Sequence, residues 1–344
     1  MVFLFKENTV MKIEVNTKSK TYPIWLERGI LSKVSQYIGK QGHVFLISDD
    51  GVPQKWQSIL QNQYPEATLY CFKNGEGSKN FTTLQEILRA MQDSHISRKD
   101  TVIALGGGVC GDMAGFAASI YMRGIPYINI PTTTLSQIDS SIGGKTAIDF
   151  NEIKNSVGAF HQPDMVFIDP DVLSTLSLRH YHNGLAEAVK EGMLCDPYLF
   201  HLFEKEDYKD HIEEILERCL RIKKQIVEED EKENGKRMLL NFGHTFGHAY
   251  ESYFGMDGYY HGECVAMGMM TIVENPELKQ RLANVLHNLD LPTTCDYDPY
   301  EIYTRIVTDK KADHDHITIV QVDELGKGSL QNWTMDQLER KLGI

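Results

Sequence analysis

The segment Thr101–Ala118 reads TVIALGGGVCGDMAGFAA and decides the expected fold. It begins with a strand-like apolar run, continues through a glycine-rich turn and ends in a helix-like stretch. Gly106, Gly108 and Gly111 match G-x-G-x-x-G, in which glycines let the backbone approach a pyrophosphate at a helix N-terminus. The pattern alone is equally compatible with a tight turn that binds nothing. We therefore expect a strand–turn–helix unit, with a dinucleotide site as one of two interpretations.

Similar strand-like runs lie on both sides of this segment. His43–Ile47, Tyr127–Ile130 and Val166–Ile168 are short and apolar, and polar residues or proline follow each of them. Helix-like stretches such as Thr82–Ser94 lie between the runs. Alternating strands and helices favour a parallel sheet that helices cover on both faces. The first half of the chain is therefore predicted to be an α/β domain.

The pattern changes after about residue 172. Residues 210–233 place most of their apolar side chains on one helical face, and the remaining side chains of that stretch are charged. The second half reads as largely helical. We predict an α/β parallel-sheet domain over residues 1–172 and a mainly α-helical domain over residues 173–344.

The bulk composition is that of an ordinary globular protein, with 42% hydrophobic and 24% charged residues. A formal net charge of −13 disfavours general nucleic-acid binding, which needs a basic surface. No apolar run approaches the ~20 residues that span a bilayer, and the N-terminus lacks the features of a signal peptide, so no membrane partner is expected. Six cysteines without a C-x-x-C pair favour a reducing cytoplasm. We expect the folded part to begin near Met11.

Two features near the glycine turn bear on the nucleotide interpretation. The acidic residue expected about 20 positions downstream of a Rossmann turn is missing, because Pro131–Thr133 occupies that place. Asp49, at the end of an earlier strand, could contact a ribose instead. A second glycine turn, Gly75–Lys79, is by itself more typical of a solvated loop than of a site.

Two further segments carry candidate site residues. Lys145 follows Gly143 and Gly144 in a turn that could hold an anion, although an exposed loop lysine would give the same pattern. Glu187 stands among apolar residues of a helix-like segment, which indicates an inward-facing acid. A buried acid needs a partner, and a metal ion is a good one. The alternative is a surface glutamate beside Lys190.

A third segment contains closely spaced histidines. His244 and His248 are four residues apart and can share one helical face. Together with His261 and Glu263 they resemble a zinc site that keeps one position open. The H-E-x-x-H pattern of metalloproteases does not fit, because residue 245 is threonine. Two packed core histidines are the alternative that this spacing leaves open.

The combination of these segments resembles the 3-dehydroquinate synthase family, from about Tyr22 to Lys311. Several blocks coincide in the same order: the glycine run with Asp112, Arg123-Gly124, Pro131–Thr133, the Gly-Gly-Lys turn, Gly158–Pro163, Glu187 with Lys190, the two-histidine block and Asp309–Lys311. The resemblance implies that the first domain binds NAD and that the second binds a metal ion and the substrate.

The resemblance also implies roles for individual residues. The metal ligands would be Glu187, His244 and His261. NAD would be held by Asp49, Glu76, Lys79, Gly107, Gly108, Val109, Asp112, Thr132, Thr133, Asp139, Lys145 and Lys154. The substrate phosphate would be bound by Lys145, Asn155, Asn241, His248 and either Lys310 or Lys311, with Arg123 reaching in from a neighbouring subunit. Lys190 and Glu233 would contact sugar hydroxyls, and Lys223 and Arg237 would bind the substrate carboxylate.

The implied enzyme is a lyase of the shikimate pathway, which leads to chorismate and the aromatic amino acids. Its substrate would be 3-deoxy-D-arabino-heptulosonate 7-phosphate, a small anionic sugar-acid phosphate, and its products would be 3-dehydroquinate and phosphate. NAD would accept and return a hydride, and one zinc or cobalt ion would polarise the substrate hydroxyls. The role implied for Arg123 predicts a homodimer.

Three positions depart from the family pattern. Gly51 stands where the family often has asparagine, and Ser177 and His180 stand where it usually has proline and glutamate. We expect these changes near the nucleotide to affect adenosine contacts and not the chemistry. Met267–Leu289 is shorter than in many members. The alternatives are another sugar-phosphate cyclase, which would lack the carboxylate contacts, a polyol dehydrogenase, which would release NADH, and a non-catalytic NAD-binding protein.

Overall fold

The computed structural model describes residues 10–39, 42–151, 153–205, 207–255, 258–309 and 316–344. The chain divides into two compact units. The first contains Met1–Ser177 and Lys223–Glu231, and the second contains Leu178–Ile222 and Lys232–Ile344. The predicted boundary between two domains at residue 172 stays a prediction.

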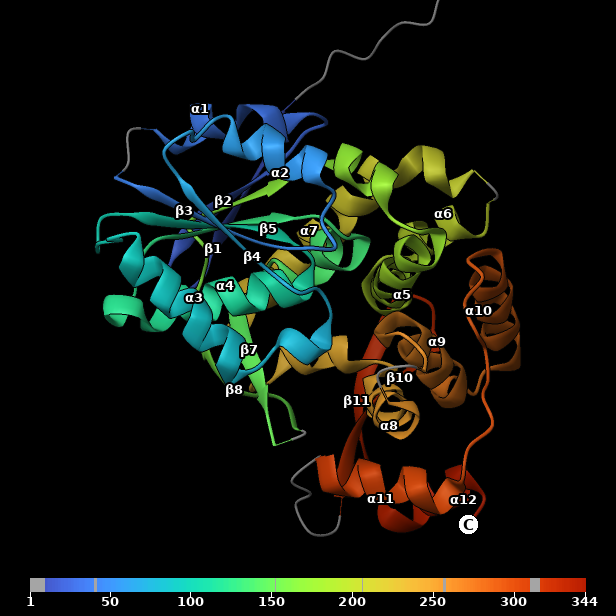
Figure 1. Cartoon of the computed structure of the whole chain (residues 1–344). Coiled ribbons are helices and arrows are strands. Elements are labelled where there is room, and N and C mark those ends of the chain that lie inside the picture. The colour runs from blue at the N-terminus through green and yellow to red at the C-terminus, as the bar shows by residue number, and fades with distance from the viewer. Residues whose placement is uncertain (1–9, 40–41, 152, 206, 256–257, 310–315) are drawn as a thin grey trace, which may run out of the picture. The chain divides into compact units, whose positions relative to one another are not determined.

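A seven-stranded sheet forms the centre of the first unit (Figure 1). Its strands are β1 (Met11–Asn16), β2 (Thr21–Leu26), β3 (Val44–Asp49), β4 (Thr68–Phe72), β5 (Thr101–Gly106), β6 (Tyr127–Pro131) and β9 (Met165–Ile168). They lie in the order β1-β2-β9-β6-β5-β3-β4. All neighbours pair in parallel except β1 and β2, which are antiparallel. The predicted parallel sheet is therefore confirmed, and it carries one antiparallel edge strand.

Helices cover both faces of this sheet, as predicted (Figure 1). They are α1 (Val34–Ile38), α2 (Gln54–Gln61), α3 (Phe81–Asp93) and α4 (Gly108–Ile120), with the short helices η1 (Ile30–Lys33), η2 (Glu76–Ser78), η3 (Tyr121–Arg123), η4 (Ser136–Ser140) and η5 (Pro170–Thr175). Helices α3 and α4 pack on the face that buries Phe45 and Ile47. Helices η1, α1 and α2 pack on the face that buries Leu46 and Ile103. Consecutive residues of a strand point to opposite faces, so one apolar strand serves both cores.

An antiparallel hairpin of β7 (Lys145–Phe150) and β8 (Ile153–Phe160) is separate from the large sheet. Asn151 in its turn has a φ of 50°, in the left-handed region that asparagine tolerates better than most residues. The backbone N–H of Asp149 donates to the carbonyl of Lys79 at 2.8 Å. This bond ties the hairpin to the loop before α3 and brings Asn155, a predicted site residue, to Lys79.

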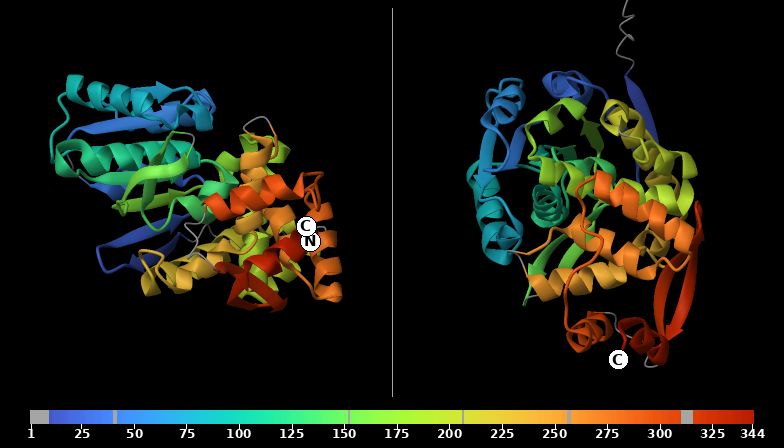
Figure 2. Two further views of the ribbon diagram at one scale, coloured as in Figure 1. Left: turned by 90° about the horizontal axis from the view of Figure 1, so that it is seen from below. Right: turned by 90° about the vertical axis from the view of Figure 1, so that its right-hand side faces the viewer.

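The second unit is mainly helical, as predicted (Figure 2). Its helices are α5 (Leu178–Cys195), α6 (Pro197–Phe203), α8 (His244–Phe254), α9 (His261–Ile272), α10 (Pro276–Asn288), α11 (Pro299–Asp309) and α12 (Met335–Leu342), with η6 (Tyr208–His211) and η7 (Lys236–Asn241). It also contains a hairpin that we did not predict, β10 (His316–Glu324) with β11 (Lys327–Thr334), drawn in red in Figure 2. Gly326 in the hairpin turn has a φ of 81° and donates its N–H to the Met193 carbonyl at 2.8 Å, which anchors the hairpin on α5. No helix in the described part of the chain is long and apolar enough to cross a membrane.

Helix α7 (Ile212–Glu229) confirms the amphipathic helix predicted within residues 210–233. Its residues from Lys223 onward group with the first unit. Just after the helix, the buried carboxylate of Glu231 accepts hydrogen bonds from the Gln162 side chain at 2.9 Å and from Ser19. These bonds fasten the end of α7 to the first unit.

Candidate active site

Three helices of the second unit approach one another closely because glycines stand where they meet. Gly262, in the first turn of α9, donates its backbone N–H to Oδ1 of Asn183 on α5 at 2.7 Å. A Cβ atom at Gly247 of α8 would lie 3.2 Å from Cα of Val265 on α9, closer than ordinary van der Waals contact. Larger residues at these positions would force the helices apart. The glycines therefore allow side chains from α5, α8 and α9 to converge.

Glu187 of α5, His244 of α8 and His261 of α9 meet in this packed region. Oε1 of Glu187 lies 3.5 Å from Nε2 of each histidine. Glu187 is 1% exposed, and this oxygen is buried without a hydrogen-bond partner among the described residues. A carboxylate oxygen that faces two imidazole nitrogens is a donor set suited to zinc and similar divalent ions. The residues present therefore fit a metal ion, and the alternative of a surface glutamate is wrong.

The charges around Glu187 set the protonation of the cluster. Burial alone would raise the pKa of Glu187, but Lys190, His244 and His261 outweigh burial and hold that pKa well below its ordinary value. Burial and the charge of Lys190 lower the pKa of His244 well below its usual range. Burial would also lower the pKa of His261, but the neighbouring carboxylates of Glu187 and Glu251 raise it to about 10. At neutral pH and without a metal ion, Glu187 is thus ionised and His244 neutral, while His261 is protonated, so an ion that bound there would displace the proton from Nε2 of His261.

Both histidines of the cluster have an acceptor for the ring nitrogen that faces away from Glu187. Nδ1 of His244 lies 3.1 Å from the backbone carbonyl oxygen of Phe242, and Nδ1 of His261 lies 3.3 Å from Oε2 of Glu251. An acceptor at Nδ1 takes the ring proton and leaves the lone pair of Nε2 for a metal. Each contact therefore favours the tautomer that a metal site at Glu187 needs.

His248 shares a face of α8 with His244, as its spacing predicted. The centroid of its ring lies 5.2 Å from that of His244 and 5.9 Å from that of His261. It belongs to a second possible ligand group with Glu251 and His261, and not to the group around Glu187. His248 is accessible to solvent, and the phosphate contact that we predicted for it stays a prediction.

The first turn of α9 is held by residues that include one departure from the family pattern. Glu263 accepts the backbone N–H of Tyr260 at 2.7 Å and pairs with Arg179 at 2.7 Å. His180 stacks on the ring of Tyr260, with centroids 4.8 Å apart. These contacts cap the helix that begins at His261. Glu263 is thus engaged in capping and lies outside the ligand group around Glu187.

In the first unit, the glycine turn joins β5 to α4 as predicted. Gly107 is the N-cap of α4, whose first residues are Gly108 and Val109. A Cβ atom at Gly107 would lie 3.0 Å from the side chain of Thr133. The strand–turn–helix unit is therefore confirmed, and the predicted NAD contacts Gly107, Gly108 and Val109 lie together at the N-terminus of a helix of 13 residues.

Asp49 lies on the strand side of the same turn. A Cβ atom at Gly106 would lie 2.9 Å from Oδ2 of Asp49. Burial raises the pKa of Asp49. Gly51 donates its N–H to Oδ1 of Asp49 at 3.0 Å. A Cβ atom at Gly51 would lie 2.6 Å from the side-chain amide of Asn74. The departure at Gly51 therefore has a local reason, since a larger residue would displace Asn74.

Lys79 is the centre of a second polar group in the first unit. It is 4% exposed, and its ammonium lies 2.6 Å from Asp112 and 3.8 Å from Glu76. Burial raises the pKa of Asp112 to about 6 against the opposing charge of Lys79. The interpretation of Gly75–Lys79 as a solvated loop is therefore wrong for Lys79. The ammonium also donates to the side chain of Asn155, a predicted phosphate contact.

The remaining predicted residues of the first unit differ in exposure. Lys145 and Lys154 on the β7–β8 hairpin are exposed, and Thr132 is buried. Asp139 on η4 forms an ion pair with Lys223, which is 4% exposed. Lys223, the predicted carboxylate contact, therefore already has a carboxylate partner.

Several predicted substrate contacts of the second unit lie on the segment that follows α7. Asn241 donates from Nδ2 to Oε1 of Glu233 at 3.1 Å, and Arg237 is 2% exposed. Glu233 has a φ of 59°, in the left-handed region. The predictions for Lys310 and Lys311 lie outside the described residues.

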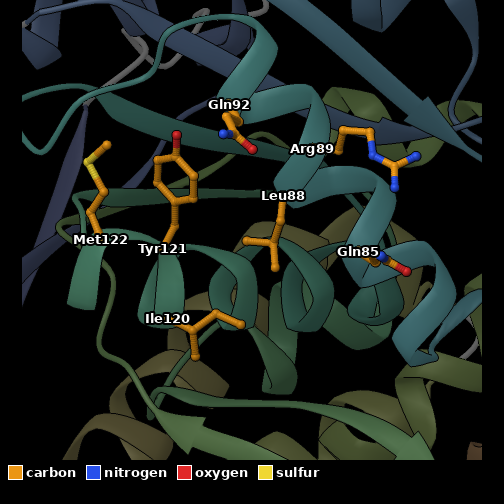
Figure 3. A pocket seen from close by; sticks show the side chains of 7 residues that line it. All are labelled: Gln85, Leu88, Arg89, Gln92, Ile120, Tyr121 and Met122. Carbon is orange, nitrogen blue, oxygen red and sulfur yellow. The ribbon is translucent and has the colours of Figure 1, made fainter.

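Arg123 ends η3 with an exposed side chain and a φ of 70°. The residues just before it line a hollow of about 450 Å³ between α3 and the end of α4 (Figure 3). The lining residues are Gln85, Leu88, Arg89, Gln92, Ile120, Tyr121 and Met122. Ile120 and Met122 are 43% and 44% exposed, a high value for large apolar side chains. None of the predicted cofactor or metal contacts lines this hollow.

Sequence reasoning missed Glu251, which lies beside the cluster of Glu187, His244 and His261. It follows His248 by three positions, a spacing that places both side chains on one helical face. This spacing can be read from the sequence, but it does not reveal that Glu251 contacts His261, which lies on another helix.

Comparison with known proteins identifies the family. Residues 69–183 match the model for the N-terminal part of 3-dehydroquinate synthase, and residues 184–312 match the model for its C-terminal part. The chain is 42% identical over 334 residues to the 3-dehydroquinate synthase of Clostridium acetobutylicum, covering 91% of this chain and 94% of that one. It is 40% identical over 355 residues to the 3-dehydroquinate synthase of Streptococcus thermophilus, covering 96% and 99%.

Solved structures confirm the fold. The chain resembles 2-deoxy-scyllo-inosose synthase complexed with carbaglucose-6-phosphate, NAD⁺ and Co²⁺, with a TM-score of 0.86, 23% identity and coverage of 96% of this chain and 99% of that one. It also resembles 2-epi-5-epi-valiolone synthase from Streptomyces hygroscopicus with NAD⁺ and Zn²⁺ bound, with a TM-score of 0.83, 26% identity and coverage of 95% and 97%. The two family models and the curated relatives show that the chain belongs to the 3-dehydroquinate synthase family.

Proposed function

We propose that this chain converts 3-deoxy-D-arabino-heptulosonate 7-phosphate into 3-dehydroquinate and phosphate, as a cytoplasmic lyase of the shikimate pathway. The structural observation that carries the proposal is the unpartnered oxygen of Glu187 that faces His244 and His261. The curated relatives favour this reaction over that of another sugar-phosphate cyclase or a polyol dehydrogenase, since relatives 37% to 42% identical are named 3-dehydroquinate synthases.

Glu187, His244 and His261 would hold one divalent ion, zinc or cobalt. When bound, the ion would supply Lewis acidity at the substrate hydroxyls, and NAD would supply reversible oxidation. The ammonium of Lys190 contacts the other oxygen of Glu187, so it would orient that carboxylate and donate to a sugar hydroxyl. The valiolone synthase at 26% identity, which was solved with NAD⁺ and Zn²⁺, supports this pair of cofactors.

The proposed NAD contacts lie at the glycine turn and around Lys79. Backbone N–H groups at the start of α4 would face the pyrophosphate, because the N-terminus of a helix favours negative charge. Glycine at position 107 keeps that approach open beside Thr133. Asp49 would accept from a ribose hydroxyl. The further contacts would be Glu76, Lys79, Val109, Asp112, Thr132, Asp139, Lys145 and Lys154.

The substrate anion would be recognised at its two charged ends. The phosphate would bind Lys145, Asn155, Asn241 and His248, and Glu233 would accept from a sugar hydroxyl. The carboxylate would bind Lys223 and Arg237. Because Lys223 also pairs with Asp139, we expect the planar two-donor guanidinium of Arg237 to provide most of the carboxylate recognition.

We further propose that the enzyme acts as a homodimer in which Arg123 serves the partner's site. The exposed Ile120 and Met122 beside the hollow of Figure 3 support this, since large exposed apolar side chains commonly mark interfaces. Sedimentation should give a dimer, and Arg123→Ala should lower turnover without changing NAD binding. A fully active monomer would contradict this part of the proposal.

A coupled assay tests the reaction itself. Protein, substrate, NAD and zinc are incubated together, and phosphate, dehydroquinate and absorbance at the NADH band are followed in parallel. We expect equal amounts of phosphate and dehydroquinate, many turnovers per NAD and no steady rise in NADH. Stoichiometric NADH release would instead identify a dehydrogenase, and turnover of a carboxylate-free sugar phosphate would identify another cyclase.

A further inference from the structure

Glu251 lies on α8, one turn after His248, and its side chain reaches across to α9. Its Oε2 is 3.3 Å from Nδ1 of His261, and the carboxylate is 16% exposed. On the opposite edge of the same ring, Nε2 of His261 faces Glu187 at 3.5 Å. The imidazole is therefore held between two carboxylates that come from two different helices.

The two ring nitrogens of a histidine have linked roles. When Nδ1 donates its proton to an acceptor, Nε2 presents a lone pair in the plane of the ring. A negatively charged acceptor also makes the imidazole a more basic ligand than a neutral acceptor does. Nδ1 of His244 contacts the backbone carbonyl of Phe242, whereas Nδ1 of His261 contacts a carboxylate. The two candidate histidine ligands therefore differ in the group that accepts from Nδ1, which is a neutral carbonyl for His244 and a charged carboxylate for His261.

We infer that Glu251 is a positioning residue of the metal centre, which fixes the tautomer and orientation of His261 so that Nε2 binds the ion. The inference rests on the proposed ligand set of Glu187, His244 and His261. Glu251 itself would not touch the ion or the substrate. Its removal would leave His261 free to rotate or to place its proton on Nε2, where the proton competes with the metal.

The same residues allow a rival arrangement. His248, Glu251 and His261 form a second group whose ligand atoms lie within 4.8 Å of one another. In that arrangement Glu251 would be a direct ligand and Nδ1 of His261 would bind the ion. The unpartnered oxygen of Glu187 argues against it, because a buried carboxylate oxygen would then stay without a partner.

Metal affinity measured without substrate separates these possibilities. Metal-free wild type, Glu187→Gln and Glu251→Gln are titrated with zinc against a chromophoric chelator, and the cobalt-loaded forms are compared by their visible absorption. Glu204→Gln is the matched control, because Glu204 contacts Nδ1 of His201 at 2.6 Å in the same unit but lies outside both ligand groups. Circular dichroism checks folding, and Glu251→Asp, which keeps the charge, serves as a second variant.

We expect Glu251→Gln to weaken zinc binding by about 10- to 100-fold and to shift the cobalt absorption bands. Glu251→Asp should weaken binding less, Glu187→Gln should weaken it more than either, and Glu204→Gln should match wild type. Unchanged affinity and spectrum in Glu251→Gln would overturn the inference while leaving the ligand set intact. Tight binding in Glu187→Gln together with none in Glu251→Gln would overturn it in favour of the rival group. Failure of wild type to bind any divalent ion would overturn the proposed function as well.

Discussion

At the scale of single residues, Lys79 in the first unit and Lys190 in the second each place a positive charge in the interior of the protein. They are 4% and 1% exposed, and each contacts a carboxylate, that of Asp112 or that of Glu187. Burying an ammonium is costly unless a charged partner compensates for the lost water. Such pairs are weak evidence for stability, but they place charge where ligands with charged groups would bind.

Asp112 gives a pH-dependent prediction. Its pKa of about 6 in the folded protein stands above the value of about 3.9 expected in the unfolded chain. The folded state therefore binds this proton more tightly, and the stability that Asp112 contributes is complete below a pH of about 4 and is lost as the pH rises through about 6. The free energy of unfolding of wild type minus that of Asp112→Asn should fall by on the order of 2 kcal/mol across this range. Urea unfolding at several pH values checks this, and a difference that does not vary with pH would contradict it.

At the scale of secondary structure elements, the close packing of α5, α8 and α9 brings the residues of the proposed metal centre together. Each helix contributes one side chain to the cluster, so a small displacement of any helix would separate the ligands. Gly262 stands at the tightest of these contacts, against the backbone carbonyl of Asn183. The ligand geometry therefore depends on residues that carry no ligand atom.

Replacing Gly262 tests this dependence. A Cβ atom there would collide with the Asn183 carbonyl, so Gly262→Ala should lower the free energy of unfolding by about 2 kcal/mol or more and weaken zinc binding. Gly77→Ala is the control, because a Cβ atom at Gly77 meets nothing within 4 Å and its φ is not in the left-handed region. The control should change the free energy of unfolding by less than about 1 kcal/mol. If Gly262→Ala and Gly77→Ala had the same free energy of unfolding and the same zinc affinity, the spacing of the helices would not control the proposed metal centre.

The elements that the sequence predicts are those with a local pattern. The buried strands β3, β5, β6 and β9 are short apolar runs, and α7 has a continuous apolar face, so their side-chain periods reveal them. We did not predict the hairpin β10–β11. One reason is that Gly326 in its turn is held by a hydrogen bond to the carbonyl of Met193, which is distant in the sequence. We did not predict the burial of Lys79 for the same reason, because its partners Asp112 and Asn155 belong to other elements. Contacts distant in sequence leave no local pattern.

At the scale of the whole molecule, an acidic chain carries locally basic site residues. The net charge is −13, yet the residues proposed to meet the anionic substrate include Lys145, Lys223 and Arg237. An overall negative charge favours solubility and repels nucleic acids, while the local cations retain attraction for a small anion. The family resemblance identified the set of candidates. The structure adds how Glu187, His244 and His261 are held, which spacing in the sequence leaves open.

In our proposal, Glu187, His244 and His261 form a metal centre on which the cyclisation depends. Wild type and Glu187→Gln are freed of metal with a chelator, and dehydroquinate formation is then measured as zinc or cobalt is added back, together with bound metal. We predict that chelated wild type is inactive and recovers with one equivalent of ion per chain, because catalytic zinc sites need their three protein ligands. Glu187→Gln should bind the ion weakly and stay inactive at the same concentration. Full dehydroquinate formation by metal-free wild type, or full recovery of Glu187→Gln, would show that the cyclisation does not depend on this centre.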